Sequence, residues 1–141
     1  MIYETFSDQE TFEIGKKLAQ KIDAGAVVCL DGDLGVGKTV FAKGFAAGLG
    51  ISEVISSPTF TIVNVYEEGR FPFFHFDVYR IADPEELFEI GFEDYVYGDG
   101  VSLIEWAGLI EDELPEGCIR VKIEKDISRG VDYRKINVEK S

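Results

Sequence analysis

The chain has 141 residues, 27 of them acidic and 14 basic, and a formal net charge of −13. This length predicts one domain over residues 1–141 without a separate substrate domain, and the charge argues against direct electrostatic binding of nucleic acid. Because no apolar run is as long as a membrane span and the N-terminus lacks the layout of a signal peptide, we expect a cytoplasmic protein with no membrane partner.

The first predicted elements are a short strand over residues 2–6 and a helix after it. Ser7 and Glu10 have the spacing of a capping box at the start of this helix, and Ala24-Gly25 would end it. The helix residues expected in the core are Phe12, Leu18, Ala19 and Ile22. The next run, residues 26–30, is continuously apolar, which is typical of a strand buried on both faces.

Residues 32–39, Gly-Asp-Leu-Gly-Val-Gly-Lys-Thr, fit the phosphate-binding P-loop pattern G-x-x-x-x-G-K-[ST]. An isolated glycine-rich octet could be a surface turn, but here a buried strand precedes it and helical spacing follows it up to Gly48 and Gly50. Lys38 would reach the β- and γ-phosphates, and the Thr39 hydroxyl would bind Mg²⁺. The residues predicted to contact the nucleotide here are Gly32, Asp33, Gly35, Val36, Gly37, Lys38, Thr39 and Val40.

The second half of the chain adds further strands and one helix. Residues 59–66 and 71–76 predict an antiparallel hairpin, and Asp83-Pro84 predicts a helix start, with Leu87 and Ile90 facing inward and Gly91 as the stop. The remaining predicted strands are residues 101–104, 118–123 and 133–138. We therefore predict an α/β fold, a P-loop NTPase-like three-layer sandwich whose parallel core strands are extended by antiparallel strands.

Two carboxylates follow apolar runs, where the ends of parallel strands would face the nucleotide. Glu105 ends a run with the form of a Walker B element, so we assign it to Mg²⁺, directly or through water. Asp77 could order the metal's waters or the attacking water. The alternative for both is an ordinary carboxylate at a strand end. Thr59, after Ser57-Pro58, could sense the γ-phosphate or metal, although spacing alone favours a turn led by proline.

The cysteines and the single histidine argue against a zinc site and against a Ser-His-Asp catalytic triad. Cys29 and Cys118 lie in apolar runs without metal-type spacing, which predicts buried free thiols. His75 is the only histidine, so the sequence offers no convincing set of residues for a zinc site or a Ser-His-Asp triad. We expect His75 at a strand end as a polar neighbour of the site.

Together, several motifs resemble the bacterial TsaE (YjeE) family over nearly the whole chain. They are residues 32–39, Ser57-Pro58-Thr59-Phe60, His75-Phe76-Asp77-Val78-Tyr79-Arg80, residues 82–87 and Leu103-Ile104-Glu105-Trp106. The resemblance implies an ATPase, using ATP and Mg²⁺, that works with TsaD and TsaB to make threonylcarbamoyladenosine beside the anticodon of ANN-decoding tRNAs.

The resemblance also implies site roles. Lys38 and Thr39 would bind phosphate and metal, Thr59 would belong to a switch, and Asp77 and Glu105 would serve hydrolysis and Mg²⁺. Trp106 and Arg134 would lie near the nucleotide, the latter through a looser match of Asp132-Tyr133-Arg134. Val40 stands where relatives often carry a second threonine.

Other functions share the P-loop. A small-molecule kinase would need an acceptor pocket and a lid that brings arginine to the phosphoryl group, but the chain has five arginines and no insertion of lid size. A GTPase is disfavoured because no N-K-x-D motif occurs. A nucleotide-gated binding module with negligible turnover is the remaining alternative.

The acidic residues are unevenly placed. Residues 81–119 hold twelve Asp and Glu and no Lys or Arg, whereas the rest of the chain has fifteen acidic and fourteen basic residues. We therefore expect contact with tRNA only indirectly, through partners, and a basic partner surface opposite this segment. The alternative is a solvated surface.

Overall fold

The computed structural model describes residues 1–33, 37–58 and 62–140. In chain order its elements are β1 Ile2–Thr5, α1 Asp8–Lys21, β2 Val27–Asp31, α2 Lys38–Gly48, β3 Val63–Tyr66, β4 Phe73–Asp77, α3 Glu85–Glu89, α4 Phe92–Val96, β5 Val101–Glu105, the 3-10 helix η1 Ala107–Glu113, β6 Ile119–Lys125, the 3-10 helix η2 Ile127–Arg129 and β7 Arg134–Lys140. In these parts of the chain, no helix combines the length and the apolar character needed to cross a membrane.

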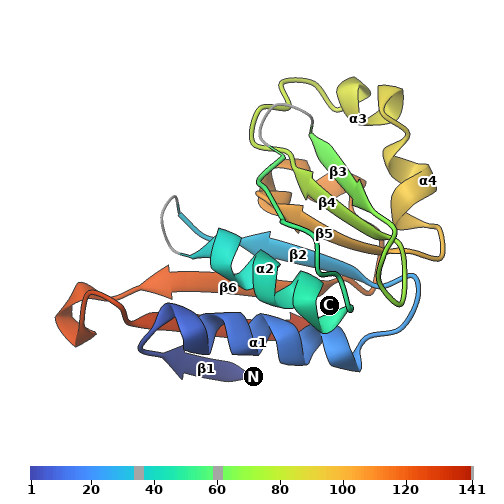
Figure 1. Ribbon diagram of the computed structural model, residues 1–141. Helices are drawn as coiled ribbons and strands as arrows, with labels where there is room; N and C mark the ends of the chain where they lie inside the picture. Colours follow the sequence, from blue (N-terminus) through green and yellow to red (C-terminus); the bar gives the residue numbers. More distant parts are fainter. Residues whose placement is uncertain (34–36, 59–61, 141) are drawn as a thin grey trace.

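The described strands form one seven-stranded sheet in the order β1-β7-β6-β2-β5-β4-β3 (Figure 1). The four central strands, β6, β2, β5 and β4, run parallel. β3 pairs antiparallel with β4 at one edge, and β7 and β1 extend the other edge in antiparallel pairing. The predicted α/β fold with a parallel core and antiparallel extensions is thus confirmed.

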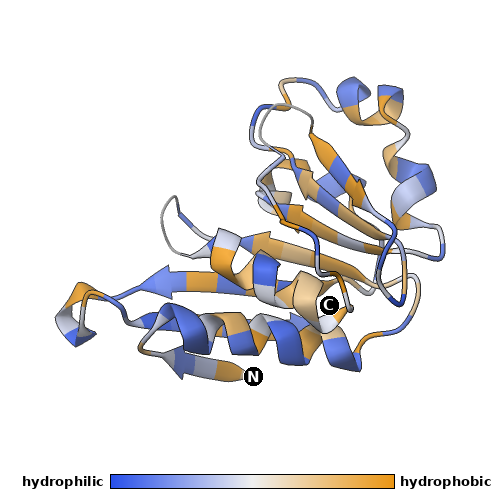
Figure 2. Cartoon of the chain, viewed as in Figure 1, coloured by the Kyte–Doolittle hydropathy of each residue, from blue (hydrophilic) through white to orange (hydrophobic). Residues whose placement is uncertain are grey.

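Both faces of the central sheet are covered. Val28 and Leu30 of β2 pack into the cluster that contains α1 and α2, while Val27 and Cys29 point into a second cluster under α3, α4 and η1. Figure 2 shows the consequence in the sequence: β2 is almost wholly hydrophobic, whereas the more peripheral β6 alternates. Cys29 and Cys118, both in the described part of the chain, are buried and form no disulfide, as predicted.

Helices α1 and α2 lie side by side because glycines allow their backbones to meet (Figure 1). A Cβ atom at Gly44 of α2 would lie 2.0 Å from the carbonyl oxygen of Phe12, and one at Gly15 of α1 would lie 2.4 Å from that of Phe41. No side chain fits at either position. The contact fixes α2, whose first residue is Lys38, against α1.

The predicted helix starts are confirmed by their hydrogen bonds. Ser7 Oγ accepts from the backbone N–H of Glu10, whose carboxylate accepts from that of Phe6. At α3, the Asp83 carboxylate accepts from the backbone N–H of Glu85, and Glu86 Oε2 accepts from those of Ala82 and Asp83.

Three differences from the prediction are local. Gly91, at φ +77°, ends α3 but leads directly into α4, a helix that the sequence analysis did not predict. The strand predicted from residue 59 begins at Val63, with residues 59–61 outside the described chain. His75 lies in the middle of β4 and is buried, so its placement at a strand end was wrong.

Candidate functional site

The register of the parallel strands brings the two predicted carboxylates together. In the β4–β5 pairing Asp77 is opposite Glu105, and both stand at the carboxyl ends of their strands. By the alternation of side chains they share the sheet face of Phe73 and Leu103, which pack in the α2 cluster. Both carboxylates therefore face the start of α2, where the phosphate-binding loop ends.

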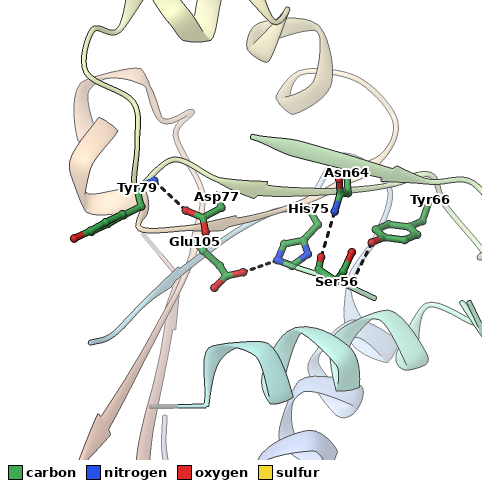
Figure 3. A network of polar contacts seen from close by, with 7 residues as sticks. All are labelled: Ser56, Asn64, Tyr66, His75, Asp77, Tyr79 and Glu105. Atoms are coloured by element: carbon green, nitrogen blue, oxygen red, sulfur yellow. Dashed lines mark hydrogen bonds and ion pairs between the residues drawn. The ribbon is translucent and has the colours of Figure 1, made fainter. Parts of the chain in front are cut away.

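Glu105 and His75 form a buried pair. His75 Nε2 lies 2.6 Å from Glu105 Oε2, and the two residues are 1% and 4% exposed (Figure 3). The other ring nitrogen, Nδ1, has no hydrogen-bond partner among the described residues. His75 was expected to be a polar neighbour of the site and was not predicted as a site residue. A signal was present, because His75 is two residues before Asp77 and so shares its face of the strand.

Asp77 forms hydrogen bonds with the backbone of two nearby residues. Its Oδ1 accepts a hydrogen bond from the backbone N–H of Tyr79, 3.0 Å away, and its N–H donates to the carbonyl of Ile62. Figure 3 shows the carboxylate beside Glu105 at the ends of β4 and β5. These contacts fix the direction in which Asp77 presents its charge.

The phosphate-binding loop is described at its two ends. Gly32 and Asp33 follow β2, and Gly37 stands before α2 with φ +98°, a left-handed conformation that glycine adopts without strain. Thr39 is exposed on the first turn of α2, and Val40 is partly buried. The predicted contacts Gly35 and Val36, like the predicted switch residue Thr59, lie outside the described residues.

Lys38 is directed back into the site. Its Nζ donates to the carbonyl oxygen of Gly32 at 2.6 Å and lies 3.4 Å from the centre of the Trp106 ring. Burial lowers the pKa of the Lys38 ammonium, while the carboxylates of Glu105 and Asp77 act in the opposite direction. The ammonium is thus a partly desolvated charge at the mouth of the loop.

Trp106 covers one side of this arrangement. Its backbone is left-handed, with φ +63°, its N–H donates to the carbonyl of Leu30, and its ring packs on Tyr79 with 4.7 Å between centroids. Ile62, whose carbonyl binds Asp77, is the other non-glycine residue of the described chain with positive φ, at +69°. Both unfavourable backbone conformations therefore adjoin the carboxylate pair.

These side chains line a cavity of about 660 Å³, within the range of small-molecule sites. The lining residues are Asp8, Gly37, Lys38, Thr39, Val40, Ser57, Asp77, Tyr79, Arg80, Glu105, Trp106, Asp132 and Arg134. A Cβ atom at Gly37 would lie 4.0 Å from Arg134 Nε, so Arg134 reaches the end of the phosphate-binding loop. Asp8, Tyr79, Arg80 and Asp132 were not predicted as site residues.

Comparison with known proteins gives consistent matches. The family model described as Threonylcarbamoyl adenosine biosynthesis protein TsaE matches residues 5–135. A Bacillus subtilis protein named tRNA threonylcarbamoyladenosine biosynthesis protein TsaE is 45% identical over 134 residues, covering 95% of this chain and 82% of that protein. A Treponema pallidum protein of the same name is 46% identical over 117 residues, covering 83% of this chain and 86% of that protein.

A solved structure agrees with the sequence matches. The crystal structure of Bacillus subtilis YdiB resembles this one with a TM-score of 0.84 and 40% identity, covering 98% of this chain and 83% of that one. The matched region of the family model includes the phosphate-binding loop, both carboxylates and Trp106. On this evidence the chain belongs to the TsaE family of threonylcarbamoyladenosine biosynthesis proteins.

Proposed function

We propose that this chain binds ATP with Mg²⁺ at the phosphate-binding loop and hydrolyses it in support of threonylcarbamoyladenosine modification of tRNA. The observation that carries the proposal is the convergence of Lys38, Asp77 and Glu105 on one cavity at the start of α2. This combination of cation, helix N-terminus and paired carboxylates suits a nucleoside triphosphate and its metal.

The phosphate contacts come from the loop and the helix. The N-terminus of α2 carries backbone N–H groups and the positive end of the helix dipole, and the Lys38 ammonium adds a full charge. The contact of Lys38 Nζ with the carbonyl oxygen of Gly32, at the other end of the loop, supports a role for this ammonium in binding a phosphate there.

The residues fit a magnesium ion that is shared with phosphate. Among the described residues no group of three or more His, Cys, Asp or Glu could hold a metal by itself. Mg²⁺ commonly takes one or two protein oxygens and completes its octahedron with phosphates and water. Thr39 and Glu105 both line the cavity and would supply such oxygens, and bound Mg²⁺ would neutralise charge on the phosphates. Asp77 would then orient water.

The name of the relatives gives the process. We propose that the chain acts as a subunit of a multi-protein complex with TsaD and TsaB, and that tRNA is contacted only through that complex. The net charge of −13 supports this division of labour, since the chain would repel the tRNA backbone.

Titration calorimetry with Mg-ATP tests the placement of the nucleotide. Lys38→Ala removes a charged contact of about 1.5 to 3 kcal/mol and should weaken ATP binding tenfold or more. The matched control is Lys43→Ala, which removes an exposed lysine from the same helix and should bind ATP as the wild type does. Equal affinity of the Lys38→Ala protein and the wild type would refute the placement.

Turnover distinguishes an ATPase from a nucleotide-gated module. Phosphate release is measured for the chain alone and with TsaD and TsaB. We expect slow hydrolysis that the partners increase. Absence of turnover under both conditions, with ATP binding intact, would support the binding module instead.

A further inference from the structure

Helix α3 and the end of η1 form an acidic surface with an exposed phenylalanine. Phe88 is 81% exposed and lines a shallow hollow with Pro84, Glu85, Glu89 and Glu113. We propose that these five residues, here called the Phe88 surface, dock a partner protein whose facing surface is basic and offers an apolar cavity to the Phe88 ring. The proposal rests on the proposed function, in that it assumes assembly with other proteins.

Only part of the acidic segment is available to a partner. Both Glu86 and Asp83 bind backbone N–H groups at the start of α3, and Glu111 forms a two-point ion pair with Arg120. By contrast, the carboxylates of Glu85, Glu89 and Glu113 are exposed and form no ion pair with a described residue. These three remain free to meet a partner's charge.

The negative charge around the Phe88 surface determines which kind of partner can bind there. Because residues 81–119 contain no Lys or Arg, a second copy of this chain that docked through the same surface would place like charges opposite each other. Nucleic acid and anionic lipid would be repelled for the same reason. A basic protein surface is attracted, and an exposed aromatic ring within a rim of charge is the arrangement of an interface anchor.

The surface is tied to the nucleotide cavity through the core. Leu87, next to Phe88, is buried in the same cluster as Val78 and Ala107. Val78 directly follows Asp77, and Ala107 directly follows Trp106, both of which line the cavity. A partner seated on Phe88 would therefore rest on a helix whose buried side packs against neighbours of the site.

Surface plasmon resonance with a purified TsaD–TsaB complex as the probe tests the proposal on the full chain with Mg-ATP. Phe88→Ser should weaken binding about 30-fold, as expected for an aromatic anchor. Glu85→Lys with Glu89→Lys should slow association and reduce its dependence on salt. Because these side chains are exposed, circular dichroism should show unchanged folding.

Matched control variants test whether the effects depend on the position of the substitutions or only on the change in charge and hydrophobicity. Ile127→Ser removes an apolar side chain that is 83% exposed on η2, and Glu67→Lys with Glu124→Lys makes the same change of net charge away from α3. Both controls should bind as the wild type does.

The outcomes discriminate this proposal from the one it rests on. Absence of binding by the wild type would overturn the assignment of partners and this surface with it. Wild-type binding that is unaffected by Phe88→Ser and by the α3 charge reversals would overturn the Phe88 surface alone. Self-association that Phe88→Ser abolishes would assign the surface to a second copy and also overturn the proposal.

Discussion

The ring of His75 donates from Nε2 to Oε2 of Glu105 across 2.6 Å, from the middle of one parallel strand to the end of its neighbour. A carboxylate only accepts, so the hydrogen of this bond is assigned to Nε2, and Nδ1 has no hydrogen-bond partner among the described residues. We therefore propose that His75 is a positioning residue, because its hydrogen bond orients the carboxylate that we propose binds Mg²⁺.

Replacing His75 tests this positioning role. His75→Phe keeps a ring of similar size but removes the donor, and outer-shell losses of this kind typically cost about 10- to 100-fold in activity or metal affinity. We expect lower kcat and a higher Mg²⁺ requirement in steady-state hydrolysis, with ATP affinity nearly unchanged. His75→Gln, which can still donate, should restore part of the activity. If both variants lost the same amount of activity and kept a normal Mg²⁺ requirement, His75 would contribute only to packing.

The carboxylate pair should separate binding from chemistry. Glu105→Gln and Asp77→Asn preserve shape but remove charge that matters most as phosphate charge moves in the transition state. We expect hydrolysis to fall about 100-fold, with ATP affinity by calorimetry changing far less. Recovery at high Mg²⁺ in Glu105→Gln alone would identify the metal ligand.

An exposed carboxylate provides the reference for that measurement. Asp112→Asn, on η1, makes the same chemical change outside the cavity and should leave turnover intact. Wild-type turnover in both cavity variants would show that the pair has no part in hydrolysis.

Lys38 predicts a pH effect on stability. Because burial lowers the pKa of Lys38, the unfolded chain binds more protons than the native state between the native pKa and 10.5, so this group's contribution to stability rises with pH there. Lys38→Met removes the desolvated charge and should melt at a higher temperature near neutral pH, with the difference from wild type shrinking as pH rises. Thermal melts from pH 7 to 10 measure this. A pH-independent difference would contradict the argument.

The contact between α1 and α2 predicts that a Gly→Ala substitution in α2 destabilises the fold, although helix propensity alone would favour it. Gly→Ala in a helix interior normally gains about 1 kcal/mol, but a Cβ at Gly44 would lie 2.0 Å from the carbonyl oxygen of Phe12. We expect Gly44→Ala to destabilise the fold by about 1 to 3 kcal/mol through overpacking, measured by urea denaturation. Lys43→Ala, exposed on the same helix, should change stability by less than about 0.5 kcal/mol.

The local order of elements around the loop could be predicted from the sequence. A buried strand, a glycine-rich loop and a helix are each visible in neighbouring residues, and so are the helix starts at Ser7 and Asp83. The strand ends at Asp77 and Glu105 could also be predicted. Their pairing could not, because it depends on β5 lying between β2 and β4, an order that is set by tertiary packing.

Helix α4 and several residues of the cavity had a weak sequence signal or none. Helix α4 has five residues, too few for a hydrophobic period to be recognised. For His75 the sequence signal was partial, because the spacing to Asp77 predicts a shared strand face, but the contact with Glu105 depends on the pairing of β4 with β5. Asp8 and Asp132 reach the cavity from elements far from the loop in sequence, which only the fold reveals.

The left-handed backbone of Trp106 has a consequence for any attempt to stabilise this protein. A non-glycine residue in that conformation costs about 1 to 2 kcal/mol, so Trp106→Gly relieves a strain that Trp106→Ala retains, and the glycine variant should be the more stable of the two in denaturation experiments. Both variants lose the ring that covers the Lys38 ammonium. Selection for thermostability alone would thus favour glycine at this position and would remove the ring that now contacts the Lys38 ammonium.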